Sequence, residues 1–316
     1  MMNNLLQLFL FLCLPCAALG GDIVIIVGAP GTPEFGKIFT TSGNSWEVAA
    51  KEGQATVTRI GTSEAGKMSD LKQLGKKLGT LAEKESKPLW IVLIGHGTFD
   101  GREAKFNLRG EDLSASMLAK WLKDSKRPIA VINTSASSAP FLKALSKKDR
   151  IVMTATKSGT EDSYARFGQY LSESINSPGA DIDQDGATSL LEAFLSATKQ
   201  VKEFYKKEGR IVTEQALVDD NGDKLGTPAD FFRGTRAVLS TKDNTVPDGF
   251  RAQQWHLVPS ESERNLPAEL RQQRDKLETE LFALRARKKS INEETYFTKM
   301  ERIARALAKI YQQAEQ

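Results

Sequence analysis

Short apolar segments alternate with amphipathic ones along the first half of the chain. Five runs rich in β-branched residues have the length of strands: 22–28, 55–60, 89–95, 128–133 and 150–155. Near-continuous apolar runs are typical of strands that are covered on both faces. Four segments between them have helical spacing: 42–52, 69–85, 114–124 and 138–147. This alternation predicts an α/β fold, a three-layer sandwich with a mainly parallel sheet.

Ligands of such sheets bind beyond the carboxyl ends of the strands. The loops that should meet at this rim follow Gly28, Gly95, Asn133 and Ala155. We therefore look for the chemistry of the protein at these four loops.

The character of the chain changes after about residue 240. Residues 241–266 are mostly polar and contain prolines, which predicts a linker after an α/β domain over 21–240. The pattern predicts helix over residues 267–316, with an interruption at 290–294. Their apolar stripes are Leu270, Leu277, Leu281 and Leu284, then Phe297, Met300, Ala304, Leu307 and Tyr311. A C-terminal helical hairpin is expected, and it must pack on the α/β domain or on a partner.

The first twenty residues contain no charged side chain. They run apolar from Leu5 to Leu14, break at Pro15 and end in small residues, which predicts a cleaved signal peptide over 1–20 and a secreted or periplasmic protein. An uncleaved anchor is the alternative. Both cysteines, Cys13 and Cys16, fall in this segment, so the mature chain would form no disulfide. No later run approaches the ~18 apolar residues of a transmembrane helix.

The composition is that of a folded domain, with 40% hydrophobic and 27% charged residues. Lys and Arg number 44 against 40 Asp and Glu, a net charge of only +4. Nucleic-acid binding rests on concentrated basic charge, so we expect no nucleic-acid partner.

A glycine-rich segment after the first strand has the spacing of a phosphate-binding loop. It runs from Gly31 to Gly36 and Lys37, but Ile38 stands where such a loop needs Ser or Thr, and Pro33 removes a backbone N–H. We interpret it as an ordinary Gly/Pro turn.

A His-Gly pair, His96-Gly97, follows the third predicted strand, and Thr134-Ser135-Ala136-Ser137-Ser138 follows the fourth. Over residues 22 to about 235 this pattern resembles the caspase-haemoglobinase fold, closest to its legumain-like branch. The resemblance places His96 on the family's catalytic histidine and Ser135 on its catalytic cysteine, 39 residues later, with Ser138 on a usual glycine.

The exchange of cysteine for serine implies a loss of activity. A serine hydroxyl is a poor nucleophile without an oriented base, and the resemblance implies no carboxylate for that purpose. We therefore expect a degenerate peptidase site that serves as a binding or scaffold module, with a protein or peptide ligand at the rim. The alternatives are a purely structural protein and an active hydrolase. In the hydrolase His96 is the base, Asp100 or Glu161 orients it, Ser135 is the nucleophile, and the N–H groups of Gly97 and Ser135 form the oxyanion hole.

A twelve-residue segment, 181–192, matches the calcium loop of the EF-hand type. Its candidate ligands are Asp181, Asp183, Asp185, the carbonyl of Ala187, Ser189 and Glu192, with Gly186 at the sharp turn. Calcium takes six to eight oxygen ligands, which this spacing supplies. The alternative is a capping box made by Ser189 and Glu192, which leaves the three aspartates unexplained.

A second acidic segment comprises Asp219, Asp220, Asn221 and Asp223. Asn-Gly is first a turn signal, and the density of carboxylates also suits a second metal site. Both interpretations stay open on the sequence.

Overall fold

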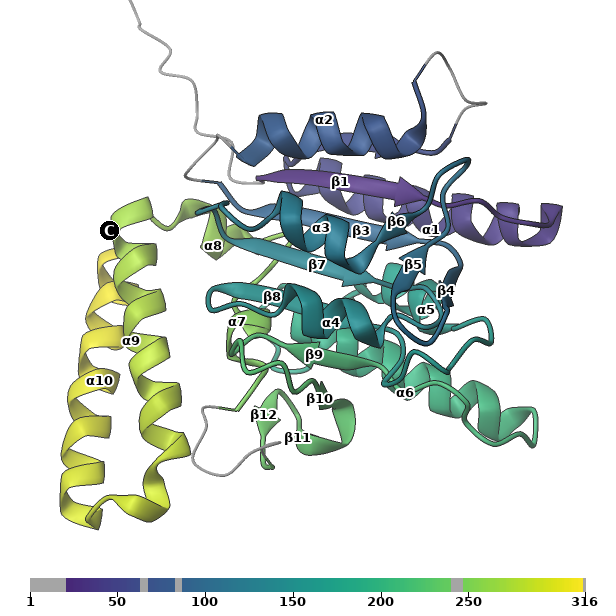
Figure 1. The fold of residues 1–316 in the computed structure, drawn as a ribbon. Helices are drawn as coiled ribbons and strands as arrows, with labels where there is room; N and C mark the ends of the chain where they lie inside the picture. Colours follow the sequence, from purple (N-terminus) through teal and green to yellow (C-terminus); the bar gives the residue numbers. More distant parts are fainter. Residues whose placement is uncertain (1–20, 63–67, 83–86, 240–246, 315–316) are drawn as a thin grey trace, which may run out of the picture.

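The computed structural model describes residues 21–62, 68–82, 87–239 and 247–314, so the predicted signal peptide with Cys13 and Cys16 lies outside the described residues. A seven-stranded sheet has the order β10-β9-β8-β7-β3-β1-β2 (Figure 1). Its strands are β1 (Asp22–Val27), β2 (Thr56–Ile60), β3 (Leu89–Ile94), β7 (Ile129–Asn133), β8 (Arg150–Thr154), β9 (Leu217–Asp219) and β10 (Thr227–Pro228). The five long strands are parallel, and β9 and β10 add an antiparallel edge.

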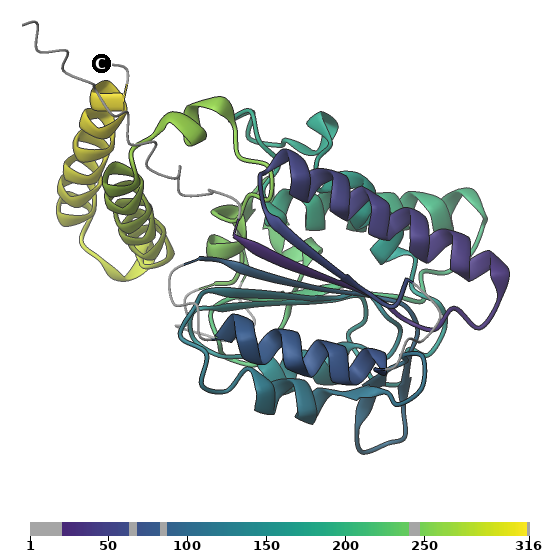
Figure 2. The same ribbon diagram turned by 90° about the horizontal axis from the view of Figure 1, so that it is seen from above.

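Helices cover both faces of this sheet, with α1 on one side and α2 on the other (Figure 2). The first layer holds α1 (Pro33–Glu52), α5 (Phe167–Ser174) and α6 (Leu190–Lys207), and the second holds α2 (Asp70–Ala82), α3 (Ala115–Trp121) and α4 (Ala139–Leu145). Strand β1 supplies both cores, because its successive side chains point to opposite faces: Ile23 and Ile25 to the first, Val24 and Ile26 to the second. The predicted three-layer sandwich is confirmed.

The first helix begins earlier than the sequence suggested. Thr32 is the N-cap and its hydroxyl accepts from the N–H of Phe35, while Pro33 occupies the first helical turn. Proline fits there, because that position needs no intrahelical N–H. The Gly/Pro turn therefore ends at Thr32, and its assignment through Gly36 and Lys37 was wrong.

Several short elements had no counterpart in the predicted order. A three-stranded antiparallel sheet follows β3 and consists of β4 (Gly97–Phe99), β5 (Ala104–Phe106) and β6 (Leu113–Ser114). A two-stranded one consists of β11 (Phe232–Arg233) and β12 (Arg236–Ala237). The single-turn helices are η1 (Pro178–Ala180) and η2 (Ala229–Phe231). Segments of two or three residues carry no periodic pattern that would reveal them.

The described part of the predicted linker packs on the α/β layers. We call residues 247–258 the strap; it contains α7 (Phe250–Gln253), and α8 (Glu261–Asn265) follows it. Asp248, Ala252 and Leu257 are buried, and the carbonyl of Trp255 accepts from the N–H of Leu190 at 2.7 Å. The strap thus belongs to the α/β body.

The predicted C-terminal helical hairpin is present and lies beyond the amino ends of the strands (Figure 1). It consists of α9 (Ala268–Ala286), η3 (Lys288–Ser290) and α10 (Glu293–Ala314). Its own core contains Leu284, Tyr296 and Ile303, whereas Phe297 and Tyr311, assigned to the buried stripe, are about half exposed. The hairpin reaches the strap through the rings of Phe250 and Phe282, whose centroids are 4.8 Å apart.

Three tryptophans form a row through the first core. The ring centroids of Trp46 on α1 and Trp90 on β3 are 6.4 Å apart, and those of Trp90 and Trp255 on the strap are 5.0 Å apart. The row joins helix, sheet and strap. None of the helices within the described residues has the length and apolarity that a membrane crossing requires.

Candidate active site and metal loop

His96 lies at the rim, between the end of β3 and the start of β4. Its Nε2 is 3.2 Å from the carbonyl oxygen of Pro30, in the loop after β1. A carbonyl only accepts, so Nε2 carries a proton and is the donor in this contact. The ring packs edge-on against Phe35 and Phe39, with Tyr164 at 6.2 Å. The loops after two neighbouring strands therefore fix this imidazole.

Ser135 follows β7 and is 1% exposed. Its Oγ donates to Asn133 Oδ1 at 2.7 Å, and its backbone N–H donates to the same oxygen at 3.1 Å. A Cβ on Gly97 would stand 2.7 Å from Ser135 Oγ and 2.2 Å from the carbonyl of Ala136. The structure thus packs Gly97, the residue after His96, directly against the Ser135 loop.

The two carboxylates considered for orienting His96 are engaged elsewhere. Asp100 accepts from the N–H groups of Arg102 and Glu103. Glu161 accepts from the N–H groups of Lys157 and Gln215. Among the described residues no carboxylate hydrogen-bonds His96.

The loop after Ser135 is held tightly. Ser137 has φ 53 in the left-handed region, and its N–H donates to the carbonyl of Glu161 at 2.8 Å. Ser138, which the resemblance aligns with a glycine, has φ −80 and bonds Thr156 through its N–H and Oγ. The backbone position that favours glycine is therefore Ser137.

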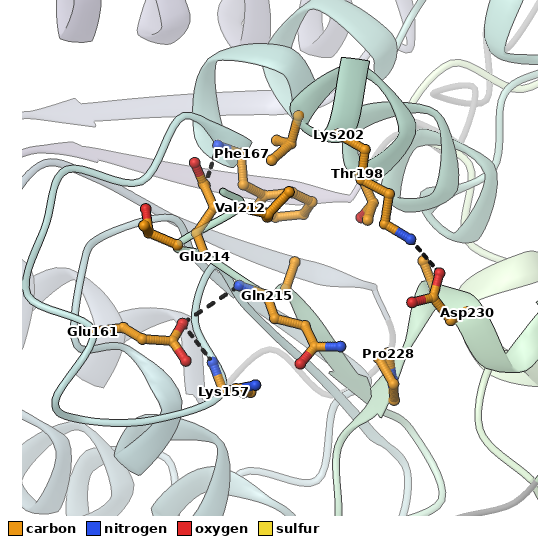
Figure 3. Close-up of a pocket in the computed structure, with 14 residues that line it drawn as sticks. Lys157, Glu161, Phe167, Thr198, Lys202, Val212, Glu214, Gln215, Pro228 and Asp230 are labelled. Carbon is orange, nitrogen blue, oxygen red and sulfur yellow. Dashed lines mark hydrogen bonds and ion pairs between the residues drawn. The ribbon is translucent and has the colours of Figure 1, made fainter. Parts of the chain in front are cut away.

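A cavity of about 470 Å³ is lined by Glu161, whose carbonyl accepts from the N–H of Ser137 (Figure 3). Phe167, Val201 and Val212 give it apolar walls, and an ion pair between Lys202 and Asp230 lies at its edge. Glu161 and Glu214 line it as well, and burial raises the pKa of both carboxyls. No pattern in the sequence indicates this cavity, because α5, α6 and the segment before β9 build it together.

The three aspartates of the predicted calcium loop converge. Ligand oxygens of Asp181, Asp183 and Asp185 lie within 4.8 Å of one another, and no other described residues form such a group. Asp181 Oδ2 accepts from the N–H of Gly186, which has φ 88, while Asp181 Oδ1 is buried without a described partner. This arrangement suits a hard cation.

The remaining residues of that loop serve the helix that follows. Ser189 and Glu192 form the capping box of α6. The buried Glu192 carboxylate accepts from the N–H groups of Ile182, Asp183 and Ser189 at 2.8, 3.1 and 2.8 Å. Ala187 is buried, and its N–H donates to Asp185. The capping box of α6 and the cluster of three aspartates are therefore both present in this segment.

The second acidic segment is a hydrogen-bonded turn. Asp219, Asn221 and Asp223 accept from N–H groups within the turn. Asp220 instead accepts from the strap, through the N–H groups of Gly249 and Ala252. The side chains of this turn therefore bind backbone, and the described residues here form no group with metal-ligand spacing.

Asp248 completes this turn and was missed in the sequence, where it stood in a predicted linker. It accepts from the N–H groups of Asp220 and Asn221 and from Thr227 Oγ1 at 2.6 Å. Burial raises the pKa of both Asp220 and Asp248, and their proximity adds to the rise at Asp248.

No family model matches the chain, and no curated protein matches it in sequence. Similar solved structures include caspase-1 from Spodoptera frugiperda, with 10% identity, a TM-score of 0.43, and 65% of this chain and 87% of that chain covered. The Drosophila initiator caspase Dronc has 15% identity, a TM-score of 0.40, and coverages of 63% and 78%. Chaetomium thermophilum Raptor has 12% identity and a TM-score of 0.36, with 49% of this chain and only 17% of Raptor covered. These likenesses concern the arrangement of helices and strands alone.

Proposed function

We propose that this chain is a secreted, calcium-binding protein of the caspase-haemoglobinase, legumain-like type whose peptidase site is degenerate and which acts as a binding module. The observation that carries the proposal is the engagement of Ser135. Its hydroxyl and its N–H both donate to Asn133 Oδ1, and the side chain is 1% exposed.

The chemistry follows from that geometry. A serine becomes a nucleophile when a base accepts its proton, yet here the proton of Oγ points to an amide oxygen. An oxyanion hole needs a free N–H, and that of Ser135 is already bound. A thiolate, by contrast, is nucleophilic without an adjacent base once its pKa is low enough. The presence of serine at position 135 therefore supports a loss of peptidase activity.

A peptide segment is the ligand that the rim supports best. The cavity lined by Glu161 combines apolar walls with charged edges, and about 470 Å³ accommodates one large side chain together with flanking backbone. Ile211 and Val212, in the extended segment before β9, are 86% and 41% exposed. Val212 lines the cavity and Ile211 does not. An apolar side chain of an extended peptide matches this surface.

Calcium is the cofactor that the 181–192 loop supports. Burial raises the pKa of Asp185, and the charges of Asp183 and Asp181 add to the rise. A divalent cation relieves this repulsion. Asp181, Asp183 and Asp185 would hold the ion, with the Ala187 carbonyl beside them, and the ion would supply stability to the loop.

The test of the rim restores the missing thiol. Wild-type protein, Ser135→Cys and the double variant Ser135→Cys/His96→Ala are incubated with a peptide library and with a serine-reactive phosphonate probe. We expect no cleavage and no labelling of the wild type, and cleavage by Ser135→Cys that disappears in the double variant. Labelling of wild-type Ser135 that depends on His96 would overturn the degenerate-site proposal.

Peptide binding is tested separately from catalysis. Peptides retained by the wild type from the same library should lose affinity for Val212→Trp, whose larger side chain fills the cavity. Ile211→Trp is the matched control and should bind as the wild type does. Equal binding by all three proteins would place the ligand elsewhere.

An active serine hydrolase is the second candidate, and the tautomer of His96 favours it. The Pro30 carbonyl holds Nε2 protonated, which leaves Nδ1 as the base without any carboxylate. Rotation of Ser135 Oγ away from Asn133 would be required. Phosphonate labelling of the wild type distinguishes this candidate from the first.

A further inference from the structure

A second cavity, of about 420 Å³, lies at the carboxyl ends of β1 and β2 and has no part in the function proposed above. Gly28 and Gly61 line it where the two strands end, and α1 lines it with Gly36, Phe39 and Thr40. Its size is within the range of small-molecule sites. A rim position beyond the strands of a parallel sheet is also where such sites occur.

Two arginines from different elements line this cavity. Arg59 on β2 is fixed, because its guanidinium donates to Asn44 Oδ1 at 2.6 Å, to Glu47 Oε2 at 3.1 Å and to the carbonyl of Thr40 at 3.3 Å. A Cβ on Gly43 would approach Arg59 Nη2 to 2.7 Å, so the absence of a side chain there lets the guanidinium lie against α1. One wall therefore presents a positioned positive charge.

Arg109, in the loop after β5, is the less satisfied of the two. Its side chain is 31% exposed, and its Nη1 is buried without a hydrogen-bond partner among the described residues. The carboxylate oxygen paired with it, Asp70 Oδ2, is 3.9 Å away, which is beyond hydrogen-bond distance. A buried guanidinium N–H without an acceptor is costly, and an anion in the cavity would relieve that cost.

The balance of charge favours an anion as well. The cavity is lined by Arg59 and Arg109 against one carboxylate, Glu47. Glu47 also forms an ion pair with Lys51, and these hydrogen bonds lower its pKa, so its charge is already compensated. Burial raises the pKa of Asp70, which weakens it as the partner of Arg109. Phe39 and Val27 offer apolar contact beside the two cations.

We propose that this cavity binds a small organic anion that carries a carboxylate or phosphate group, with Arg109 as the principal donor and Arg59 as the second positive charge. The walls accept apolar contact as well, so the ligand is larger than a bare inorganic ion. The site is independent of both Ser135 and the calcium loop.

The experiment titrates the full-length protein with inorganic phosphate and, in a second arm, with malonate, in calcium-free buffer with calorimetric detection. We expect saturable binding of one molecule per chain by at least one probe, with a Kd of about 1 mM or tighter, because each probe supplies only the anionic group. The stronger probe identifies the phosphate or the carboxylate class. Affinity should fall as salt is raised.

Arg109→Gln should weaken binding about tenfold or more, which corresponds to about 1.4 kcal/mol. Arg102→Gln is the matched control, since Arg102 is exposed on the neighbouring β4–β5 turn and does not line the cavity. Unchanged melting temperatures establish that both variants are folded. No saturable binding of either probe, or equal binding by Arg109→Gln and Arg102→Gln, would overturn the proposal.

Discussion

Substitutions at Asp183 and Glu192 distinguish the two roles of the 181–192 loop, which are the proposed binding of calcium and the capping of helix α6. The Asp183 carboxylate accepts from Gln253 Nε2 at 3.2 Å and is otherwise exposed. Asp183→Ala therefore removes a proposed metal ligand and leaves the fold without metal almost unchanged. Glu192 accepts from three backbone N–H groups and is 1% exposed, so Glu192→Ala damages the loop whether or not calcium is present.

The magnitudes of the two effects differ in their dependence on metal. Loss of an N-terminal cap costs about 1 kcal/mol, and a buried N–H left without an acceptor costs about 1–3 kcal/mol. Glu192→Ala should therefore cost roughly 3 kcal/mol or more in chelator. Calcium at a hundredfold excess over Kd stabilises the native state by about 2.7 kcal/mol, and Asp183→Ala should lose most of that gain in calcium only.

The assay is thermal unfolding by calorimetry in calcium chloride and in chelator. A change of about 2.7 kcal/mol corresponds to roughly 4 °C for a chain of this size. Wild type should melt higher in calcium by this amount, Asp183→Ala should show little difference, and Glu192→Ala should melt low in both buffers. Asp162→Ala, at an exposed carboxylate in the loop before α5, is the control. If the wild type melts at the same temperature in both buffers, the calcium prediction is wrong and the capping box alone explains the loop.

Three further predictions follow from buried groups. Burial and the nearby Asp220 raise the pKa of Asp248 to about 8, so the folded chain keeps a proton that the unfolded chain releases. The free energy of unfolding should therefore fall by up to about 1.4 kcal/mol per pH unit between roughly pH 4 and 8, and Asp248→Asn should flatten this slope in urea denaturation; an unchanged slope would contradict the assignment. Arg127 is fully buried, pairs with Asp22 at 2.9 Å and donates to three carbonyls, so Arg127→Met should cost about 3–5 kcal/mol in urea denaturation, and a loss under about 1 kcal/mol would refute it. A Cβ on Gly97 would collide with the Ala136 carbonyl, so Gly97→Ala should cost about 1–3 kcal/mol by thermal unfolding, whereas Gly79→Ala, where nothing lies within 4 Å, should not destabilise.

Hydrophobic periodicity predicted the layers of the fold because it reports burial directly. The five long strands were found within one or two residues of their ends, since runs such as 22–27 are buried on both faces. The predicted start of helix α1 was too late. Pro33 and Gly36 are typical turn residues, and the prediction did not take Thr32 into account as a helix cap. The small sheet β4–β6 depends on tertiary contacts that three-residue segments do not encode.

The sequence predicted which loops meet at the candidate site but not the hydrogen bonds that their side chains form. The strand order places the loops of His96 and Ser135 side by side, and this follows from the resemblance and the parallel sheet. The acceptor of the Ser135 hydroxyl, Asn133, lies two residues away, yet its rotamer depends on packing. Asp248 was hidden because a buried acidic residue within a polar segment looks like any exposed turn.

The row of indole rings gives the protein an optical reporter of its own. Trp90 and Trp255 are close enough for their excited states to interact, and the carbonyl of Trp255 holds the N–H of Leu190 at the start of α6. The next residue, His256, forms a β-bridge with Ser189, the ninth position of the predicted calcium loop. Indole emission shifts in colour and intensity with local polarity and with neighbouring rings. Events at the metal loop can therefore be followed through intrinsic fluorescence, without a label attached to the chain.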